Sequence, residues 1–271
     1  MIKQAIIPLA GLGTRLLPLT SVLPKELLPI NGIPGLQYIL DECYEAGIKE
    51  IIFVISNKKK IIKKYFNNDQ FFLKIIKNKR KDKRLINEYN KIKKFKKMIK
   101  FVYQTSPKGT GDAILKCQKL IKSNFFMMLL PDDLIIKKNC TIDMLKLHKK
   151  YKSSVIASKK VKRSDVSRWG IFKMRKINKS AFDISDVIEK PSIKFAPSTQ
   201  AVIGRYILPK KIFKVLKKQK PGKNKEVHIT DAIRTLIFEK NKFIGHVFSG
   251  KYLDCGTLKG YIKSSLEISR L

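Results

Sequence analysis

The chain has 271 residues, of which 44% are hydrophobic and 9% aromatic, so it can bury a large core and is not a disordered chain. Its formal net charge of +38 suggests a nucleic acid or an anionic membrane as partner. Lysine, isoleucine and asparagine are all abundant, however, and all three have A/T-rich codons, so base bias of the genome explains the charge economically. We therefore expect weak, salt-dependent attraction to polyanions, but no specific nucleic acid and no membrane.

The cysteines and histidines exclude two kinds of site. Cys43, Cys117, Cys140 and Cys255 lie far apart without a C-x-x-C pair, which predicts reduced, mostly buried thiols in a cytoplasmic protein. The 3 histidines are too scattered for an imidazole metal site. Any metal is therefore expected to be a hard cation held by carboxylates.

The first half of the sequence alternates strand-like and helix-like segments. Strands are expected at the short apolar runs Gln4–Ala10, Glu50–Ser56, Lys100–Ser106 and Phe125–Asp133. Helical spacing occurs between them, at Leu36–Ala46 and Gly111–Ile121. This alternation predicts an α/β fold with a Rossmann-like open sheet, mixed but mostly parallel, flanked by helices on both faces.

The second half has a different pattern of predicted elements, with short strands followed by two helices and then a C-terminal helix. We expect its strands to continue the same sheet and to carry a small lobe that covers the substrate. Residues 1–271 then form a single domain with halves at 1–150 and 151–271. The lysine-rich stretch Lys74–Lys100 is expected to be an exposed helical excursion with a solvated basic face.

The most informative segment is PLAGLGTRLLPLTSVLPKELLPI, residues 8–30, which follows the first predicted strand directly. In open parallel sheets, ligands bind outside the carboxyl ends of the strands. Gly11 and Gly13 let backbone N–H groups approach a phosphate, and Arg15 and Lys25 add cations. The glycines alone would indicate only a turn, since no P-loop or dinucleotide glycine motif is present. Glycines and cations together indicate a nucleotide site.

The order G-x-G-T-R, then P-K-E-L-L-P, resembles the signature of the nucleotidyltransferases that activate sugar 1-phosphates, and AGLGTR with PKE is similar to the bacterial UTP–glucose-1-phosphate uridylyltransferases. Further segments agree in order and spacing over nearly the whole chain: QTSPKGTGDAI (104–114), LPDD (130–133), IEKPSIKFAPSTQAVIGRYIL (188–208), EVHITDAI (226–233) and LDCG (253–256). The resemblance implies the fold of nucleotide-diphospho-sugar transferases, with 1–150 as the nucleotide-binding half and 151–271 as the sugar-binding half with a C-terminal helix.

The same resemblance implies an activity. UTP and glucose 1-phosphate would be joined into UDP-glucose with release of pyrophosphate, assisted by Mg²⁺, in a homo-oligomer (dimer or tetramer). Three features depart from the family pattern: Asp112 stands where histidine is commoner, Asp133 stands where an apolar residue is usual, and the chain stops soon after its last helix. The last departure bears on the oligomeric state.

Transfer to a phosphate nucleophile requires alignment of two polyanions and neutralisation of charge, not a catalytic base. Asp132 ends a buried apolar run and Asp254 precedes Gly256; each has the alternative of a turn or capping role. The resemblance implies that both hold the metal, that Arg15 and Lys25 contact the UTP phosphates, and that Lys190 contacts the sugar phosphate.

The remaining site residues are also implied by the resemblance. For the nucleotide they are Ala10, Gly11, Gly13, Glu26, Gln104 and Gly109. For the sugar they are Gly170 and Glu189, with Gly204 close by for packing or a backbone contact. Uracil needs an acceptor between donors, and Gln104 can supply both roles, whereas the alternative for Glu26 is capping.

Two alternatives stay open at this point. A thymidylyltransferase or another sugar nucleotidyltransferase shares the loop but not the PKE and E-K-P to G-R-Y segments. A basic nucleic-acid-binding protein without catalysis would explain the charge, but the basic residues do not interleave with aromatic ones in a single patch.

Overall fold

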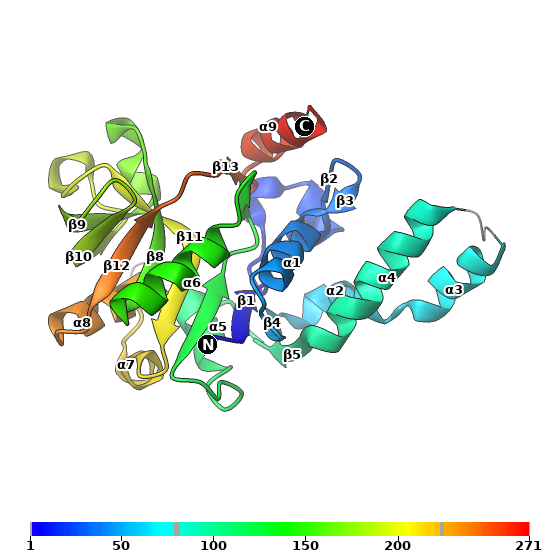
Figure 1. Cartoon of the computed structure of the whole chain (residues 1–271), viewed down its shortest axis with the longest axis horizontal. Helices are drawn as coiled ribbons and strands as arrows, with labels where there is room; N and C mark the ends of the chain where they lie inside the picture. Colours follow the sequence, from blue (N-terminus) through cyan, green and yellow to red (C-terminus); the bar gives the residue numbers. More distant parts are fainter. Residues whose placement is uncertain (1, 79–81, 223–224, 271) are drawn as a thin grey trace.

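The computed structural model describes residues 2–78, 82–222 and 225–270, and Figure 1 shows it as a sheet with helices packed on both sides. Within these residues, nine strands form one open sheet in the order β5 (Ile99–Tyr103), β4 (Glu50–Ile55), β1 (Gln4–Pro8), β6 (Phe125–Leu129), β11 (Gln200–Pro209), β8 (Ser154–Lys160), β12 (Phe243–Val247), β10 (Ala181–Glu189) and β9 (Gly170–Lys176). Two short strand pairs stand apart from it: β2 (Pro29–Ile30) with β3 (Ile33–Pro34), and β7 (Asp133–Ile136) with β13 (Lys251–Asp254).

The strand directions divide the sheet into two parts. β5, β4, β1 and β6 run parallel to one another, as the strand–helix alternation predicts. Beyond β6 the pairs are antiparallel except for β12 with β8, and β9 and β10 are consecutive strands joined by a short connection, as antiparallel neighbours can be. The predicted α/β fold with an open mixed sheet is confirmed, and its parallel character is concentrated in the first half.

Alternating residues of the strands point to opposite faces of the sheet and pack into two hydrophobic cores. Ile6, Val54 and Met128 pack on one face, and Ile7 and Phe53 pack on the other. This alternation follows from the two-residue repeat of a strand, and it explains the continuous apolar runs in the sequence. Helices therefore cover both faces of the sheet, as predicted.

The helices divide between the two faces accordingly. The face of Ile6 is covered by α5 (Thr110–Leu115), α7 (Ile212–Lys218) and α8 (Ile229–Phe238). The other face is covered by α1 (Gly35–Glu45), α2 (Lys60–Asn67), α4 (Lys83–Met98), α6 (Cys140–Tyr151) and α9 (Leu258–Ser269). Among the described helices, none has both the length and the apolarity needed to cross a bilayer.

Helix α5 is shorter than the helix predicted over Gly111–Ile121. It ends at Leu115, and the following residues form tight turns in which the Cys117 N–H donates to the Ile114 carbonyl at 2.9 Å. The four cysteines are free and buried, as predicted.

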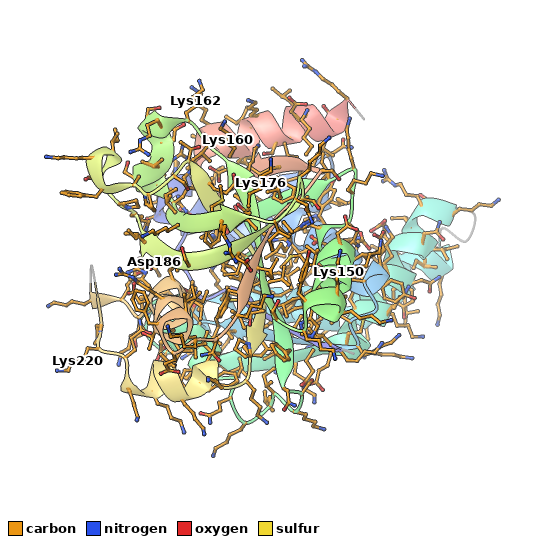
Figure 2. The ribbon with its side chains drawn as sticks, turned by 60° about the vertical axis from the view of Figure 1, so that its left-hand side comes forward. Lys150, Lys160, Lys162, Lys176, Asp186 and Lys220 are labelled. Atoms are coloured by element: carbon orange, nitrogen blue, oxygen red, sulfur yellow. The ribbon has the colours of Figure 1, made fainter. Side chains whose placement is uncertain are left out.

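Helix α3 (Asp69–Asn78) and helix α4 form an arm that extends away from the body of the molecule beside β5 (Figure 1). Ile92 and Phe95 anchor α4 to the core, while lysines such as Lys93 and Lys97 are exposed. The expected exposed helical excursion is thus present, although residues 79–81 of that stretch lie outside the described residues. Lysine side chains also stand out from the rest of the surface, for example Lys160, Lys162 and Lys220 (Figure 2).

Candidate active site

The glycine-containing loop leaves the sheet at the end of β1 and turns back through short helical turns. Gly13 has φ +72°, a left-handed conformation that favours glycine, and its carbonyl accepts a hydrogen bond from Thr20 Oγ1 at 2.8 Å. Ala10 is buried, whereas Gly11 is exposed, and an added Cβ at Gly11 would meet nothing within 4 Å. The loop therefore offers open space beside its backbone at Gly11, as a phosphate-binding turn requires.

Lys25 and Asp132 meet at the carboxyl edge of the parallel strands. β1 and β6 are parallel neighbours, so the segments that follow them emerge at the same edge. Lys25 Nζ lies 2.5 Å from Asp132 Oδ2, and the two side chains are 15% and 18% exposed. Arg15 Nη2 lies 3.8 Å from the same oxygen. The predicted convergence of the loop with the first acid is therefore observed.

The ionisation of this pair follows from its contacts. Burial alone would raise the pKa of Asp132, but the Lys25 ammonium outweighs it and lowers that pKa below its usual range. Burial would lower the pKa of Lys25, yet the Asp132 and Glu26 carboxylates raise it. Both groups are therefore charged at neutral pH, which gives the site one fixed cation and one fixed anion.

Asp254 approaches the same point from β13. A Cβ added to Gly256 would lie 2.8 Å from Asp132 Oδ2 and 3.2 Å from Asp254 Oδ1, so glycine leaves room between the two carboxylates. The Gly256 N–H donates to Asp254 Oδ1 at 2.9 Å, and Arg168 Nη2 lies 3.2 Å from Asp254 Oδ2. The second predicted acid thus converges with the first.

These two carboxylates fit a magnesium ion. Magnesium prefers hard oxygen ligands and is commonly held by one or two carboxylates together with substrate phosphates. Among the described residues, no group of three or more His, Cys, Asp or Glu side chains is arranged to hold a metal by itself. A donor set of this kind suits an ion that arrives with a nucleotide rather than one held in a closed structural site.

Gln104 and Gly109 follow β5 on the same edge. Gln104 is buried, and its Nε2 donates to Asp112 Oδ2 at 2.6 Å. Gly109 has φ +94°, and a Cβ there would lie 2.7 Å from the Val227 carbonyl oxygen, so only glycine fits. Asp112 thus fixes the direction of the Gln104 amide.

Glu26 is buried beneath the loop rather than exposed at it. Both of its carboxylate oxygens accept hydrogen bonds from Lys59 Nζ, at 2.7 and 2.8 Å. Burial lowers the pKa of Lys59, and the Glu26 carboxylate opposes that effect. The structure therefore places Glu26 in an ion pair that supports the Lys25 segment.

The residues expected on the sugar side gather at the end of β10. Glu189 pairs with Gly170 across the β10–β9 ladder, and its Oε2 accepts a hydrogen bond from Thr230 Oγ1 at 2.8 Å. Lys190 has a left-handed backbone with φ 45°, and its Nζ lies 3.7 Å from Glu189 Oε1. Both residues line a cavity of about 230 Å³ together with His228, Asp231 and Arg234 on or beside α8, and Val187 and Ile188.

Gly204 is buried inside β11, and its backbone N–H and carbonyl both form hydrogen bonds within the protein. Its N–H donates to Asp133 Oδ2 at 2.9 Å, and its carbonyl accepts from the Leu130 N–H at 2.8 Å. The predicted position near the site is correct. Of the two roles expected for Gly204, packing is the one that these contacts support.

Sequence reasoning missed several residues that touch the predicted ones, chiefly Arg168, Thr230 and Lys59. Arg168 had a usable signal, because an arginine is uncommon in this lysine-rich chain and directly precedes the segment that contains Gly170. Lys59 had none, since it lies in a run of three lysines of which it alone is buried.

Comparison with known proteins agrees with this geometry. The chain matches the nucleotidyl transferase family over residues 4–270 and belongs to that family. It is 35% identical to a UTP–glucose-1-phosphate uridylyltransferase of Pseudomonas aeruginosa over 98% of this chain and 95% of that protein. It is 36% identical to one of Streptococcus pyogenes over 98% of this chain and 88% of that protein.

Solved structures give the same result. A UDP-glucose pyrophosphorylase complexed with UDP-glucose has a TM-score of 0.88 at 36% identity and covers 100% of this chain and 99% of that one. A UTP-bound UGPase from Acinetobacter baumannii has a TM-score of 0.88 at 30% identity, over 99% of this chain and 93% of that one. A thymidylyltransferase structure from Bacillus anthracis, at 19% identity and a TM-score of 0.77, shares the fold.

Proposed function

We propose that this chain transfers the uridylyl group of UTP to α-D-glucose 1-phosphate, giving UDP-glucose and pyrophosphate. The observation that carries the proposal is the meeting of Lys25, Asp132 and Asp254 beside the glycine loop at the carboxyl edge of the sheet. The uridylyltransferases that are 35–36% identical over nearly the whole chain support the choice of nucleotide and sugar.

The reaction is a direct displacement. An oxygen of the sugar phosphate attacks the α-phosphorus, and the bond to the leaving pyrophosphate breaks. The nucleophile is already an anion near neutral pH, so no side chain needs to remove a proton. The site has to bring two polyanions together, which is the task of fixed positive charges.

Lys25 and Arg15 supply positive charge beside the loop for the UTP phosphates, and Lys190 supplies it on the sugar-phosphate side. Burial would lower the pKa of Lys25, but the Asp132 and Glu26 carboxylates raise it, and a phosphate in the place of Asp132 would supply the same stabilising negative charge, so the ammonium stays charged. Asp132 and Asp254 would hold Mg²⁺ together with phosphate oxygens. That ion would neutralise charge on the transferring phosphate and on pyrophosphate as it leaves.

The orientation of Gln104 supports uracil binding. An ionised carboxylate only accepts hydrogen bonds, so the Gln104 amide group must donate to Asp112. The carbonyl Oε1 is then the atom that accepts from the imide N–H of uracil. Backbone groups at Ala10, Gly11, Gly13 and Gly109 complete the nucleotide contacts, and Glu26 contributes through its ion pair with Lys59.

On the sugar side, Glu189 and the Gly170 backbone bind glucose hydroxyls. Thr230 donates to one oxygen of Glu189, and the other, which lies 3.7 Å from Lys190 Nζ, can still accept from a hydroxyl. A site built to bond a hydroxyl strongly rejects a sugar that lacks it, because its buried polar group is then left unpaired.

Two wider features belong to the proposal. Leu258, Ile262 and Leu266 form a stripe along α9, with exposed fractions of 41%, 50% and 53%, which supports a homo-oligomer. Free buried thiols and nucleotide substrates support a cytoplasmic location. Sedimentation of the purified chain tests the first point, and a monomer at micromolar concentration would contradict it.

The activity is tested by following pyrophosphate release with purified protein. UTP, dTTP, CTP and ATP are each paired with glucose 1-phosphate, and UTP is paired with galactose 1-phosphate and mannose 1-phosphate. We expect the highest kcat/KM for UTP with glucose 1-phosphate. Faster release with dTTP would make the chain a thymidylyltransferase, and no release from any pair would overturn the proposal.

A further inference from the structure

Asp133, the neighbour of Asp132, is a buried acid with two specific partners. It is 8% exposed; its Oδ1 accepts a hydrogen bond from the Tyr252 hydroxyl at 2.5 Å, and its Oδ2 accepts from the Gly204 N–H at 2.9 Å. Both oxygens are thus used within the protein. Asp133 therefore has a role different from that of Asp132, whose carboxylate meets Lys25.

These two hydrogen bonds join three strands at the site. Asp133 begins β7, Gly204 lies in β11, and Tyr252 lies in β13. The β7–β13 ladder sets Asp133 opposite Asp254, and the Cys255 N–H donates to the Asp132 carbonyl at 2.8 Å. Asp132 and Asp254 converge at Gly256. The hydrogen bonds of Asp133 therefore link the chain segments that carry these two acids.

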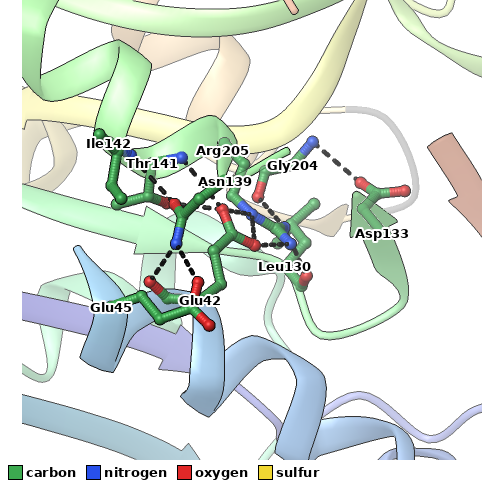
Figure 3. A network of polar contacts seen from close by, with 9 residues as sticks. All are labelled: Glu42, Glu45, Leu130, Asp133, Asn139, Thr141, Ile142, Gly204 and Arg205. Carbon is green, nitrogen blue, oxygen red and sulfur yellow. Dashed lines mark hydrogen bonds and ion pairs between the residues drawn. The ribbon is translucent and has the colours of Figure 1, made fainter. Parts of the chain in front are cut away.

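The partner of Asp133 on β11 is itself held firmly. Arg205, which follows Gly204, is fully buried, and its guanidinium contacts both oxygens of Glu42 on α1, with Nη2 at 2.8 Å from Oε2 (Figure 3). Its Nη1 donates to the carbonyls of Gly204 at 2.9 Å and of Leu130 at 3.2 Å. The hydrogen bond between Gly204 and Asp133 thus connects Asp133 to a part of β11 that buried contacts hold in place.

A buried acid next to another acid is unfavourable for stability. Among the described residues, the hydrogen-bond donors of the Asp133 carboxylate are a hydroxyl and a backbone N–H rather than a lysine or an arginine, and its neighbour in the chain is the Asp132 carboxylate. An apolar residue at this position would avoid that cost. Residues that lower stability in this way concentrate at functional sites.

We propose that Asp133 is a positioning residue that fixes the spacing between the carboxylates of Asp132 and Asp254. The inference rests on the proposed role of those two acids in holding a divalent ion. Groups that hold a metal ligand in place change metal affinity or activity by roughly 10- to 100-fold when they are removed. A residue that served only the fold would change stability instead.

The experiment compares Asp133→Val, Tyr252→Phe and Ser158→Ala with the unchanged protein. Tyr252→Phe deletes only the hydroxyl that bonds Asp133 and keeps the ring beside Trp169. Ser158→Ala is the matched control, because it removes a buried hydrogen bond between β8 and β11 from Gln200 Nε2 at 2.6 Å. The measurements are kcat and KM, urea unfolding, and Mn²⁺ affinity with UTP alone, followed by water-proton relaxation.

For Asp133→Val we expect kcat to fall and Mn²⁺ binding to weaken by about 10-fold or more, with KM for glucose 1-phosphate within about twofold. Tyr252→Phe should shift both quantities in the same direction by a smaller factor. Asp133→Val removes a buried charge but leaves the Gly204 N–H and the Tyr252 hydroxyl without their acceptor, so the two effects on stability oppose each other and its urea midpoint should fall no further than that of Ser158→Ala. Ser158→Ala should lower the urea midpoint and leave kcat and Mn²⁺ affinity unchanged.

Two outcomes separate this inference from the proposed function. If the unchanged protein turns over and binds Mn²⁺, but Tyr252→Phe and Asp133→Val match it in both, the positioning role is overturned. If Asp133→Val does not fold, Tyr252→Phe decides alone. If the unchanged protein neither binds Mn²⁺ with UTP nor releases pyrophosphate, the proposed function fails, and the positioning role fails with it.

Discussion

The candidate active site and the α3–α4 arm use charged residues in different ways. In the site, the side chains of Lys25 and Asp132 are 15% and 18% exposed and touch at 2.5 Å. On the arm, Lys91 and Glu88 are 44% and 30% exposed and lie 3.6 Å apart. The first pair is largely shielded from water and salt, so its charges act on each other and on a ligand, whereas the second is screened.

This contrast shows how to find function in a chain of such high charge. The sequence contains 59 lysines and arginines, and most of them face solvent, so their number says little about mechanism. The basic residues that packing distinguishes from this background are shielded and paired: Lys25, Lys59 and Arg205. Arg15 and Lys190 are exposed, so their proposed roles rest on their positions beside the site and not on burial. Substitutions in the two regions test this distinction.

The largest effect is expected from Asp132→Ala. Loss of this carboxylate removes a metal ligand and the partner of Lys25, and metal assistance is worth several kcal/mol, so turnover should fall by roughly three orders of magnitude or more. Pyrophosphate release measures the change, and circular dichroism checks the fold. Asp132→Asn, which keeps the shape but not the charge, should be similarly inactive. Near-normal turnover in either variant would remove Asp132 from the mechanism.

The next effect is on stability. Arg205→Met leaves Glu42 buried without its guanidinium partner, although Thr141 still donates to it at 2.7 Å. Breaking a buried pair from one side should lower the free energy of unfolding by about 3–5 kcal/mol. Urea unfolding measures this loss. The double variant Arg205→Met with Glu42→Leu should regain much of it, because no unpaired charge remains; a single variant within about 1 kcal/mol of the unchanged protein would contradict the expectation.

Lys25→Ala compares the two regions directly. Removal of one fixed positive charge from a developing transition state costs about 10²- to 10³-fold in kcat. Lys93→Ala, on the exposed face of α4, should change kcat by less than about twofold, since surface substitutions of this kind have little effect. Steady-state rates of the two purified variants give the ratio. Equal losses would mean that charge acts across the whole surface rather than in the site.

Much of the fold and of this site could be predicted from local sequence patterns. Buried parallel strands have continuous apolar runs, so β1, β4 and β6 were recognisable, and Asp132 falls after one of them, where ligands bind in such sheets. The role of Asp132 at the metal was implied only by the family resemblance. The approach of Asp254 to Asp132, however, depends on the pairing of β7 with β13, whose members lie more than a hundred residues apart. The prediction of that approach rested on family resemblance.

The contacts that support the site were beyond sequence reasoning for a physical reason. Glu42 and Arg205 form a buried pair across 163 residues, and nothing in the helix around Glu42 distinguishes it from a surface glutamate. Glu26 was expected to contact the uracil base, but its environment is set by Lys59, a single buried lysine among exposed ones. Side-chain partners at long separation arise from packing, which local propensity does not encode.

The smallest effect concerns the surface charge itself. We expect the chain to bind single-stranded DNA weakly at low salt, because its net charge of +38 releases counterions from any polyanion. Fluorescence anisotropy with oligonucleotides of unrelated sequence should show equal affinities that fall by at least about 10-fold between 50 and 200 mM salt. Lys93→Gln with Lys97→Gln should weaken binding slightly without altering turnover, because both residues lie on the exposed part of the arm. Tight binding to one sequence at physiological salt would instead give the basic surface a function of its own, and the contrast between shielded and exposed charge would then no longer separate function from background.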